Sequence, residues 1–288
     1  MKKRLLLKLL VSLLCLQSIT IFASSLSIEK KEINLNLIWI SMPHSLKGLS
    51  ELPGPRDGYD YEGDYHYTEV PKFWLFLNQD IPITVSIHWC ALNEDDRDKI
   101  EKIYLDLESE YTKDGFNIKF IEFNIESDPF FQNMIYAGAH AGALSDYLRL
   151  KIFVEKYLAG SLINKTYVYA DFDIEPFCFS NLLLPDRTST KFPLDSFVSY
   201  LGENSFLSIP GESPYFETLS RYFEIDREIF IKTFDEDRER ICKLFDPLES
   251  IFYTAIRECT FSSELPEGFK MVNADDLNII SLDHESWK

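Results

Sequence analysis

The sequence predicts an α/β fold in which helices flank a mostly parallel sheet. Short apolar segments with strand character alternate with amphipathic helical segments, and this alternation is typical of parallel sheets connected through helices. The chain has 288 residues, of which 45% are hydrophobic and 15% aromatic, so it can bury a sizeable core. The helical pattern continues beyond residue 211, which predicts extra C-terminal helices.

The individual elements follow from periodicity and from their end signals. Asn93 and the acids after it form a helix start, and Asp114-Gly115 a helix end, around apolar residues at helical spacing. Thr166–Ala170 is a short apolar strand that runs directly into Asp171. On the same grounds we expect a loop over 48–63, strands over 34–40, 82–88 and 116–123, helices over 71–78 and 145–158, and extended structure over 268–281.

The charge balance excludes one class of partner. There are 29 basic and 47 acidic residues, a net charge of −18, with a sequence pI of about 4.7. Nucleic-acid binding depends on Lys and Arg, so we expect no nucleic-acid partner. An anionic nucleotide would need a local positive charge, and a divalent cation held by carboxylates is one source of it.

The first 25 residues have the pattern of a targeting segment. A basic start at Lys2-Lys3-Arg4 precedes an apolar stretch, which ends in the small residues Ala23-Ser24-Ser25. We expect a signal peptide and an exported or secreted protein. The alternatives are an uncleaved segment that anchors the protein in a membrane, and an ordinary helix.

Beyond this leader the chain has four cysteines: Cys90, Cys178, Cys242 and Cys259. An exported chain with an even number of cysteines can form disulfides, while buried free thiols are the other interpretation. Their spacing includes no CxxC pair, so a zinc site is not expected.

An acidic pair follows the strand that ends at Ala170. In an extended segment Asp171 and Asp173 would point to the same side, while Phe172 packs on the other. Neighbouring carboxylates repel each other unless a cation lies between them or one of them stays protonated, and oxygen ligands suit Mn²⁺ or Mg²⁺. Ligands of open α/β sheets bind beyond the carboxyl ends of the strands, so we expect Trp39–Ser41 to lie at the same edge.

A second pair precedes this strand, on the helix predicted over 145–158. Asp146 and Arg149 are three residues apart and share a face of that helix. One interpretation is a simple intrahelical ion pair, worth a few tenths of a kcal/mol. The other is a sugar-binding pair that faces the crevice at the strand ends.

Together these motifs resemble a known superfamily. The run 143–150 with Ser145-Asp146 and Arg149, followed by a helix and then by Tyr169-Ala-Asp-Phe-Asp173, is similar to the D-x-D region of GT-A glycosyltransferases. That superfamily includes the large clostridial glucosylating cytotoxins and the yeast-type initiating mannosyltransferases. Three further segments resemble its other motifs: Leu37–Ile40, Glu203–Pro214 and His284–Trp287. The resemblance covers residues 34–288 and implies one GT-A-like domain.

The resemblance also implies roles for individual residues. Asp173 would be the principal metal ligand, with Asp171 reaching the metal through water or binding the ribose and sugar. Asp146 and Arg149 would hold the sugar, and His284 would ligate the metal or contact phosphate. The donor-binding residues would be Trp39, which stacks on the base, Tyr169 and Asn204, which line the site, and Ser286 and Trp287, which donate to the β-phosphate.

The function expected on this basis is metal-dependent, retaining transfer of a hexose or N-acetylhexosamine. The donor would be a nucleoside-diphosphate sugar, with a UDP-linked one favoured, and the acceptor a protein or glycan hydroxyl. Two alternatives remain open. One is a secreted module that binds a sugar nucleotide or glycan without turnover. The other is an aspartyl-type phosphatase, although Glu175-Pro176 stands where that class has Thr or Gly after its second Asp.

Overall fold

A computed structural model describes residues 31–41, 67–136, 138–139, 141–200, 203–213 and 271–281, with 216, 220 and 224 described singly. The elements they form lie in one compact unit, Glu32–Lys288. The predicted leader (1–25), the loop over 48–63 and nearly all of the predicted C-terminal helices fall outside the described residues. Within the described residues, no helix is both long enough and apolar enough to cross a bilayer.

A seven-stranded mixed sheet forms the centre of the structure, in the order β3-β2-β1-β4-β8-β7-β9. The pairs β1/β2, β2/β3, β1/β4 and β7/β9 are parallel, whereas β8 runs antiparallel to β4 and β7. The prediction of an α/β fold with a mostly parallel sheet is therefore confirmed. The strands are β1 (Glu32–Ser41), β2 (Ile83–Ala91), β3 (Ile118–Glu122), β4 (Lys165–Ala170), β7 (Phe197–Tyr200), β8 (Glu203–Pro210) and β9 (Met271–Asn273).

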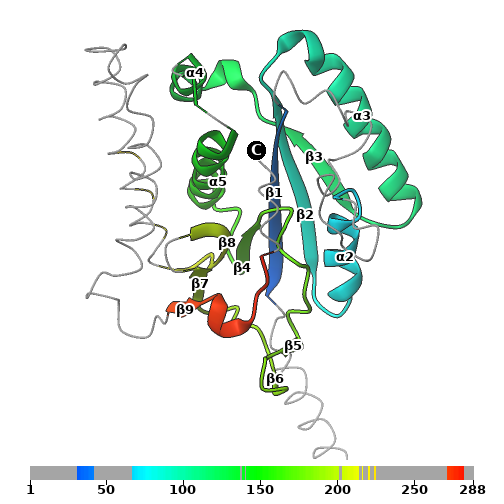
Figure 1. Ribbon diagram of the computed structural model, residues 1–288, viewed down its shortest axis with the longest axis vertical. Helices are drawn as coiled ribbons and strands as arrows, with labels where there is room; N and C mark the ends of the chain where they lie inside the picture. Colours follow the sequence, from blue (N-terminus) through cyan, green and yellow to red (C-terminus); the bar gives the residue numbers. More distant parts are fainter. Residues whose placement is uncertain are drawn as a thin grey trace, which may run out of the picture. The chain divides into compact units, whose positions relative to one another are not determined.

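Helices cover both faces of this sheet (Figure 1). On one face, α4 (Pro129–Tyr136) and α5 (Ala141–Leu158) pack on a core that contains Ile38 and Ile40 of β1. On the other, α2 (Val70–Leu77) and α3 (Glu94–Lys113) pack on a core that contains Leu35 and Leu37. Successive residues of β1 thus serve opposite cores, as the pleat of a strand requires.

Most of the predicted elements are present within a few residues of their expected bounds. The C-terminal segment differs, because only Met271–Asn273 is a strand and a 3₁₀ helix, η2 (Asp275–Leu277), follows it. The sequence analysis did not identify β7, α4, the short 3₁₀ helix η1 (Ile125–Ser127), or the small hairpin of β5 (Leu182–Leu183) and β6 (Ser189–Thr190).

The Pro210-Gly211 turn after β8 requires a glycine. A Cβ atom at Gly211 would lie 1.9 Å from the carbonyl oxygen of Leu162, and the Gly211 N–H donates to the carbonyl of Lys165 at 2.8 Å. The turn therefore lies directly against the connection between α5 and β4. This contact fixes the end of β8 relative to β4, the strand that leads into Asp171.

A partly buried polar cluster lies between α5 and the sheet. Lys156 of α5 donates from Nζ to the side-chain oxygens of Asn34 and Asn36, at 2.7 Å each. His88 Nε2 lies 3.0 Å from the same Asn36 oxygen. Because an amide oxygen can only accept, His88 donates from Nε2 and is the Nε2-protonated tautomer. The alternating Asn residues of β1 thus face a helix rather than solvent.

This environment keeps His88 neutral. Burial, with a further contribution from the positive charge of Lys156, lowers the pKa of His88 to about 3. Burial likewise lowers the pKa of Lys156 to about 8, and Lys165 adds to that effect. Between pH 4 and 7, therefore, Lys156 stays charged while the folded chain leaves His88 unprotonated.

We predict that His88 makes the fold sensitive to mild acid. Below its ordinary pKa of 6.5 the unfolded chain takes up a proton at His88, whereas the folded chain does so only near pH 3. Its contribution to stability is complete above pH 6.5 and decreases as the pH falls, by up to about 1.4 kcal/mol per pH unit. His88→Gln removes this dependence. The difference in the free energy of urea unfolding between wild type and variant should therefore decrease from pH 7 to pH 4. A difference that is the same at every pH would contradict the prediction.

Candidate active site at the end of β4

The chain turns directly after β4 instead of continuing as a strand. The N–H of Ile174 donates to the carbonyl of Asp171 at 3.1 Å, and Ile174 then bridges to Ser281 near the C terminus. The prediction that Asp171 and Asp173 lie in an extended segment is therefore wrong, because Asp171–Ile174 is a tight turn. That both carboxylates point to the same side stays a prediction. Phe172 does pack into the α2/α3 core, on the opposite face from the contacts of Asp171.

The Asp171 carboxylate meets two groups on the α5 side of the sheet. The hydroxyl of Tyr169 donates to its Oδ1, and the guanidinium Nη2 of Arg149 lies 3.5 Å from the same oxygen. Arg149 Nη2 is also 3.1 Å from Asp146 Oδ1 and donates to Ser145 Oγ at 3.2 Å. The sequence-predicted residues Asp146, Arg149, Tyr169 and Asp171 thus lie together, joined through one guanidinium.

The exposure of these side chains differs in a way that matters for ligand access. The side chain of Arg149 is 4% exposed and that of Asp146 10%, whereas that of Asp171 is 20% exposed. Arg149 also lies over the ring of Tyr169, with 4.5 Å from its Cζ to the ring centroid. Within this group, the Asp171 side chain is therefore the most accessible to a ligand, and the Arg149 side chain is nearly inaccessible.

Burial and the neighbouring polar groups have opposite effects on the ionisation of Asp171. Burial raises the pKa of the Asp171 carboxyl, and the charge of Arg149 and the hydrogen bond from Tyr169 only partly offset this effect. The pKa of the Tyr169 hydroxyl is raised well above its usual value, chiefly by burial, so it stays protonated and remains a donor. The ionised form of Asp171 therefore benefits from any additional positive charge nearby.

Trp39 lies at the same edge of the sheet, as predicted. The parallel register of β1 and β4 aligns Asn36 with Tyr169, which brings Trp39 level with the turn. Its ring contacts that of Phe172 edge-on, with centroids 6.0 Å apart, and it is only partly buried. The proximity of Trp39 to the acidic turn is confirmed, while its predicted stacking on a base stays a prediction.

Other predicted site residues fall outside the described part of the chain. His284, Ser286 and Trp287 follow the last described residue, Ser281, and the side chain of Asn204 is also not described, although its backbone belongs to β8. Among the described residues, no group of three or more His, Cys, Asp or Glu side chains is placed to hold a metal ion. Asp171 and Asp173 are thus two carboxylates without a third described ligand.

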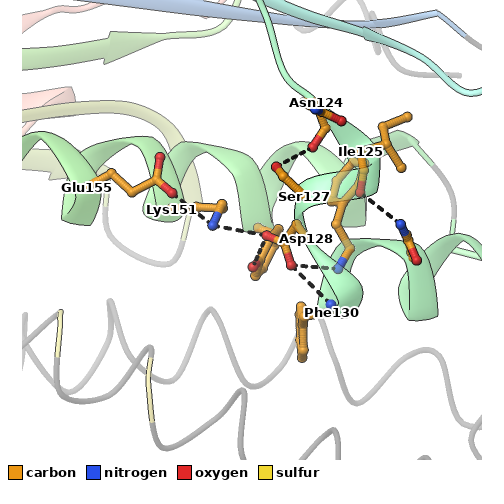
Figure 2. Close-up of polar contacts among 10 residues, drawn as sticks. Asn124, Ile125, Ser127, Asp128, Phe130, Lys151 and Glu155 are labelled. Carbon is orange, nitrogen blue, oxygen red and sulfur yellow. Dashed lines mark hydrogen bonds and ion pairs between the residues drawn. The ribbon is translucent and has the colours of Figure 1, made fainter.

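The helix that carries Asp146 and Arg149 is anchored by Asp128, which the sequence analysis missed (Figure 2). Asp128 is buried, and its Oδ1 accepts the N–H groups of Phe130 and Phe131 at the start of α4, at 3.0 and 3.2 Å. Its Oδ2 accepts from the Tyr147 hydroxyl at 2.7 Å and lies 3.1 Å from Lys151 Nζ. One carboxylate therefore caps α4 and ties it to α5.

Two buried serines of β8 were also missed. In the described part of the structure, the hydroxyls of Ser205 and Ser208 have no hydrogen-bond partner, although the residues are 3% and 0% exposed. Ser205 accepts the backbone N–H of Asp171 through its carbonyl, at 2.8 Å. A sequence signal was available. Ser205, Leu207 and Ile209 occupy every second position of β8 and so share one face, and the two apolar residues of this set pack in the core under α5.

A cavity of about 840 Å³ lies at the ends of β2 and β3, between α4 and the start of α3. Its lining contains none of the predicted site residues. Much of its polar lining is engaged in local structure: Asn93 and Asn124 accept backbone N–H groups, and Arg97 pairs with Glu122. The candidate site at the end of β4 therefore rests on its side-chain cluster and not on this cavity.

Comparisons with known proteins find similarity among solved structures but not among family models or curated proteins. No protein-family model matches the chain, and no curated protein does so either. Among solved structures the chain is similar to one described as "PaToxG Glycosyltransferase", with a TM-score of 0.42 and 15% sequence identity. The similarity covers 78% of this chain and 68% of that one. These values are too low to show common family membership.

We predict that Asp128 is a main determinant of stability on this side of the sheet. Burial alone would raise its pKa, but hydrogen bonds from Tyr147, the Phe131 N–H and Lys151 outweigh that effect and lower it. Asp128→Ala removes the cap and leaves the Tyr147 hydroxyl and Lys151 without this acceptor, at a cost of about 3 kcal/mol. Asp128→Asn keeps an acceptor for the cap and should cost less.

Urea unfolding of both variants measures this effect, with Asp106→Ala on the exposed face of α3 as the control. A loss in Asp128→Ala no larger than in Asp106→Ala would show that the anchor contributes little.

Proposed function

We propose that the protein is a metal-dependent, retaining glycosyltransferase that uses a nucleoside-diphosphate sugar, with a UDP-linked donor favoured. The observation that carries this proposal is the cluster of Asp146, Arg149, Tyr169 and Asp171 at the carboxyl end of β4, on the α5 side of the sheet. Trp39 lies at the same edge of the sheet, against Phe172 on the α2/α3 side. The sequence resemblance assigns these residues to one sugar-nucleotide site, and the structure brings Trp39 to the same edge of the sheet as Asp171 although 132 residues separate the two.

In this proposal the sugar is held by carboxylate and guanidinium groups. Sugar hydroxyls both donate and accept, so they pair with a carboxylate such as Asp171 and with N–H groups of Arg149. Asp146 fixes the orientation of Arg149, because its Oδ1 lies 3.1 Å from Nη2. Trp39, with Phe172 packed edge-on against it, offers a partly exposed aromatic surface for the base.

The two turn carboxylates suit Mn²⁺ or Mg²⁺ in their chemistry. Mg²⁺ is bound through one or two carboxylates, with water and substrate phosphate oxygens completing its shell, so a third protein ligand is not required. The raised pKa of Asp171 fits this assignment, since a nearby cation would favour its ionised form. Asp173 and Asp171 would hold the ion, with His284 as a further candidate, and the ion would supply positive charge against the departing diphosphate.

The remaining roles follow the resemblance. Ser286 and Trp287 would donate hydrogen bonds to the β-phosphate, and Asn204 would contact the donor from β8. The acceptor would be a protein or glycan hydroxyl. The leader pattern at 1–25 would export the protein or anchor it to a membrane.

One specific observation supports a second candidate, a module that binds a sugar nucleotide without turnover. Asp171 Oδ1 already accepts from Tyr169 and faces Arg149, so part of the carboxylate is committed within the protein. A site of this kind can hold sugar hydroxyls while it lacks the metal that activates the leaving group.

We predict that the purified protein hydrolyses a UDP-sugar in the presence of Mn²⁺ and that Asp173→Asn reduces the rate at least about 100-fold. Removing a ligand of an ion that stabilises developing charge has an effect of that order. UDP-glucose, UDP-N-acetylglucosamine and GDP-mannose serve as donors, with release of the nucleoside diphosphate as the readout and Asp106→Asn as the matched control. Activity that survives chelation and the Asp173→Asn change would refute metal dependence. Donor binding without turnover would favour the binding module.

A further inference from the structure

Ser205 lies opposite Asp171 of the candidate sugar site, and its hydroxyl has no hydrogen-bond partner among the described residues. The carbonyl of Ser205 accepts the N–H of Asp171 at 2.8 Å, and the adjacent pairs are Phe206 with Ala170 and Leu207 with Tyr169. Residues opposite each other in an antiparallel pair direct their side chains to the same face of the sheet. Ser205 and Asp171 are opposite in this sense.

The core contacts identify that face. Leu207 and Tyr169 both belong to the core under α5, whereas Phe206 and Ala170 belong to the core under α2 and α3. Alternation along β8 therefore places the Ser205 side chain on the α5 face, which also carries Arg149. Ser208 lies on the other face, aligned with Val168 and Val198.

A buried hydroxyl without a partner is unfavourable, because it has lost its hydrogen bonds to water. Ser205 is 3% exposed, and none of the described residues bonds to its Oγ. Ser208 is fully buried, and its hydroxyl also has no partner among the described residues. The residues paired with Ser208 in the sheet, however, do not belong to the candidate site. In Ser205 the hydroxyl lies next to the turn that the proposed function assigns to the donor sugar.

We propose that Ser205 binds the donor sugar, with its Oγ hydrogen-bonded to a ring hydroxyl of the hexosyl group. This assignment rests on the proposed glycosyltransferase function and adds a residue to its donor site. A serine hydroxyl offers one donor and two acceptor positions, which matches a sugar hydroxyl. Bound sugar would then satisfy a hydroxyl that has no partner in the described part of the chain, and Ser205 would help to select among donors that differ at the bonded sugar hydroxyl.

The test compares Ser205→Ala with Ser208→Ala in the full chain. Both changes delete a buried hydroxyl that has no partner among the described residues, so both should leave the thermal midpoint unchanged or slightly higher. With Mn²⁺ present, Ser205→Ala should weaken binding of UDP-glucose about three- to tenfold, whereas Ser208→Ala should leave it unchanged. Ser205→Thr, which retains the hydroxyl, should restore most of the affinity.

Deoxy donors identify the hydroxyl concerned. For UDP-glucose analogues that lack single ring hydroxyls, the wild type should lose affinity for the analogue without the Ser205 partner. Ser205→Ala should show no further loss for that analogue, because the two changes delete the same hydrogen bond.

The outcomes separate this inference from the function on which it rests. Unchanged affinity in Ser205→Ala, or an equal loss in Ser208→Ala, would overturn the assignment of Ser205 and leave the glycosyltransferase proposal intact. A wild-type protein that neither binds nor hydrolyses UDP-glucose, UDP-N-acetylglucosamine or GDP-mannose would overturn the proposed function, and the assignment of Ser205 with it.

Discussion

The guanidinium of Arg149 is a nearly buried cation held between carboxylates from two elements. Asp146 belongs to the same helix, whereas Asp171 belongs to the turn after β4, so the pairing ties α5 to the edge of the sheet. Taking a charge out of water is strongly unfavourable unless it is paired and hydrogen-bonded. Loss of either carboxylate would leave the nearly buried Arg149 with one of these two partners and would break the link between α5 and the turn or within α5. The geometry of the turn and the position of α5 therefore depend on each other.

Most strands of the sheet could be predicted from the sequence, but the backbone conformation around Asp171 and Asp173 could not. Alternation of side chains holds only while the chain remains extended, and β4 ends at Ala170. Ile174 pairs with Ser281, a contact across more than 100 residues that no local pattern reveals. The i, i+3 spacing of Asp146 and Arg149 needed no such contact, and their ion pair is present as that spacing suggested. The resemblance placed Asp171 in the same site, but its direct pairing with Arg149 became visible only in the structure.

Two other features show the same limit of local reasoning. Asn34 and Asn36 alternate with leucines, a pattern that is typical of a strand with one face in solvent, yet their side chains meet Lys156 of α5. Helix α4 has a usable start signal in Asp128-Pro129, a capping residue followed by a proline at the first position. The role of Asp128 in joining α4 to α5 depends on Tyr147 and Lys151, which follow it by 19 and 23 residues.

Charge balance at the turn bears on how a diphosphate could bind there. In the described part of this edge, Asp146, Asp171 and Asp173 stand against Arg149, and the whole chain carries a net charge of −18. Arg149 is already engaged by two carboxylates, so its charge is not free to neutralise a phosphate. An anionic ligand would meet a site that is negative overall, and like charges at such distances are mutually unfavourable. A divalent cation shared by the turn carboxylates and the diphosphate reverses this balance, because it adds two positive charges where the anions meet. A metal ion in the proposed reaction is thus expected on electrostatic grounds as well as from the resemblance of the motif.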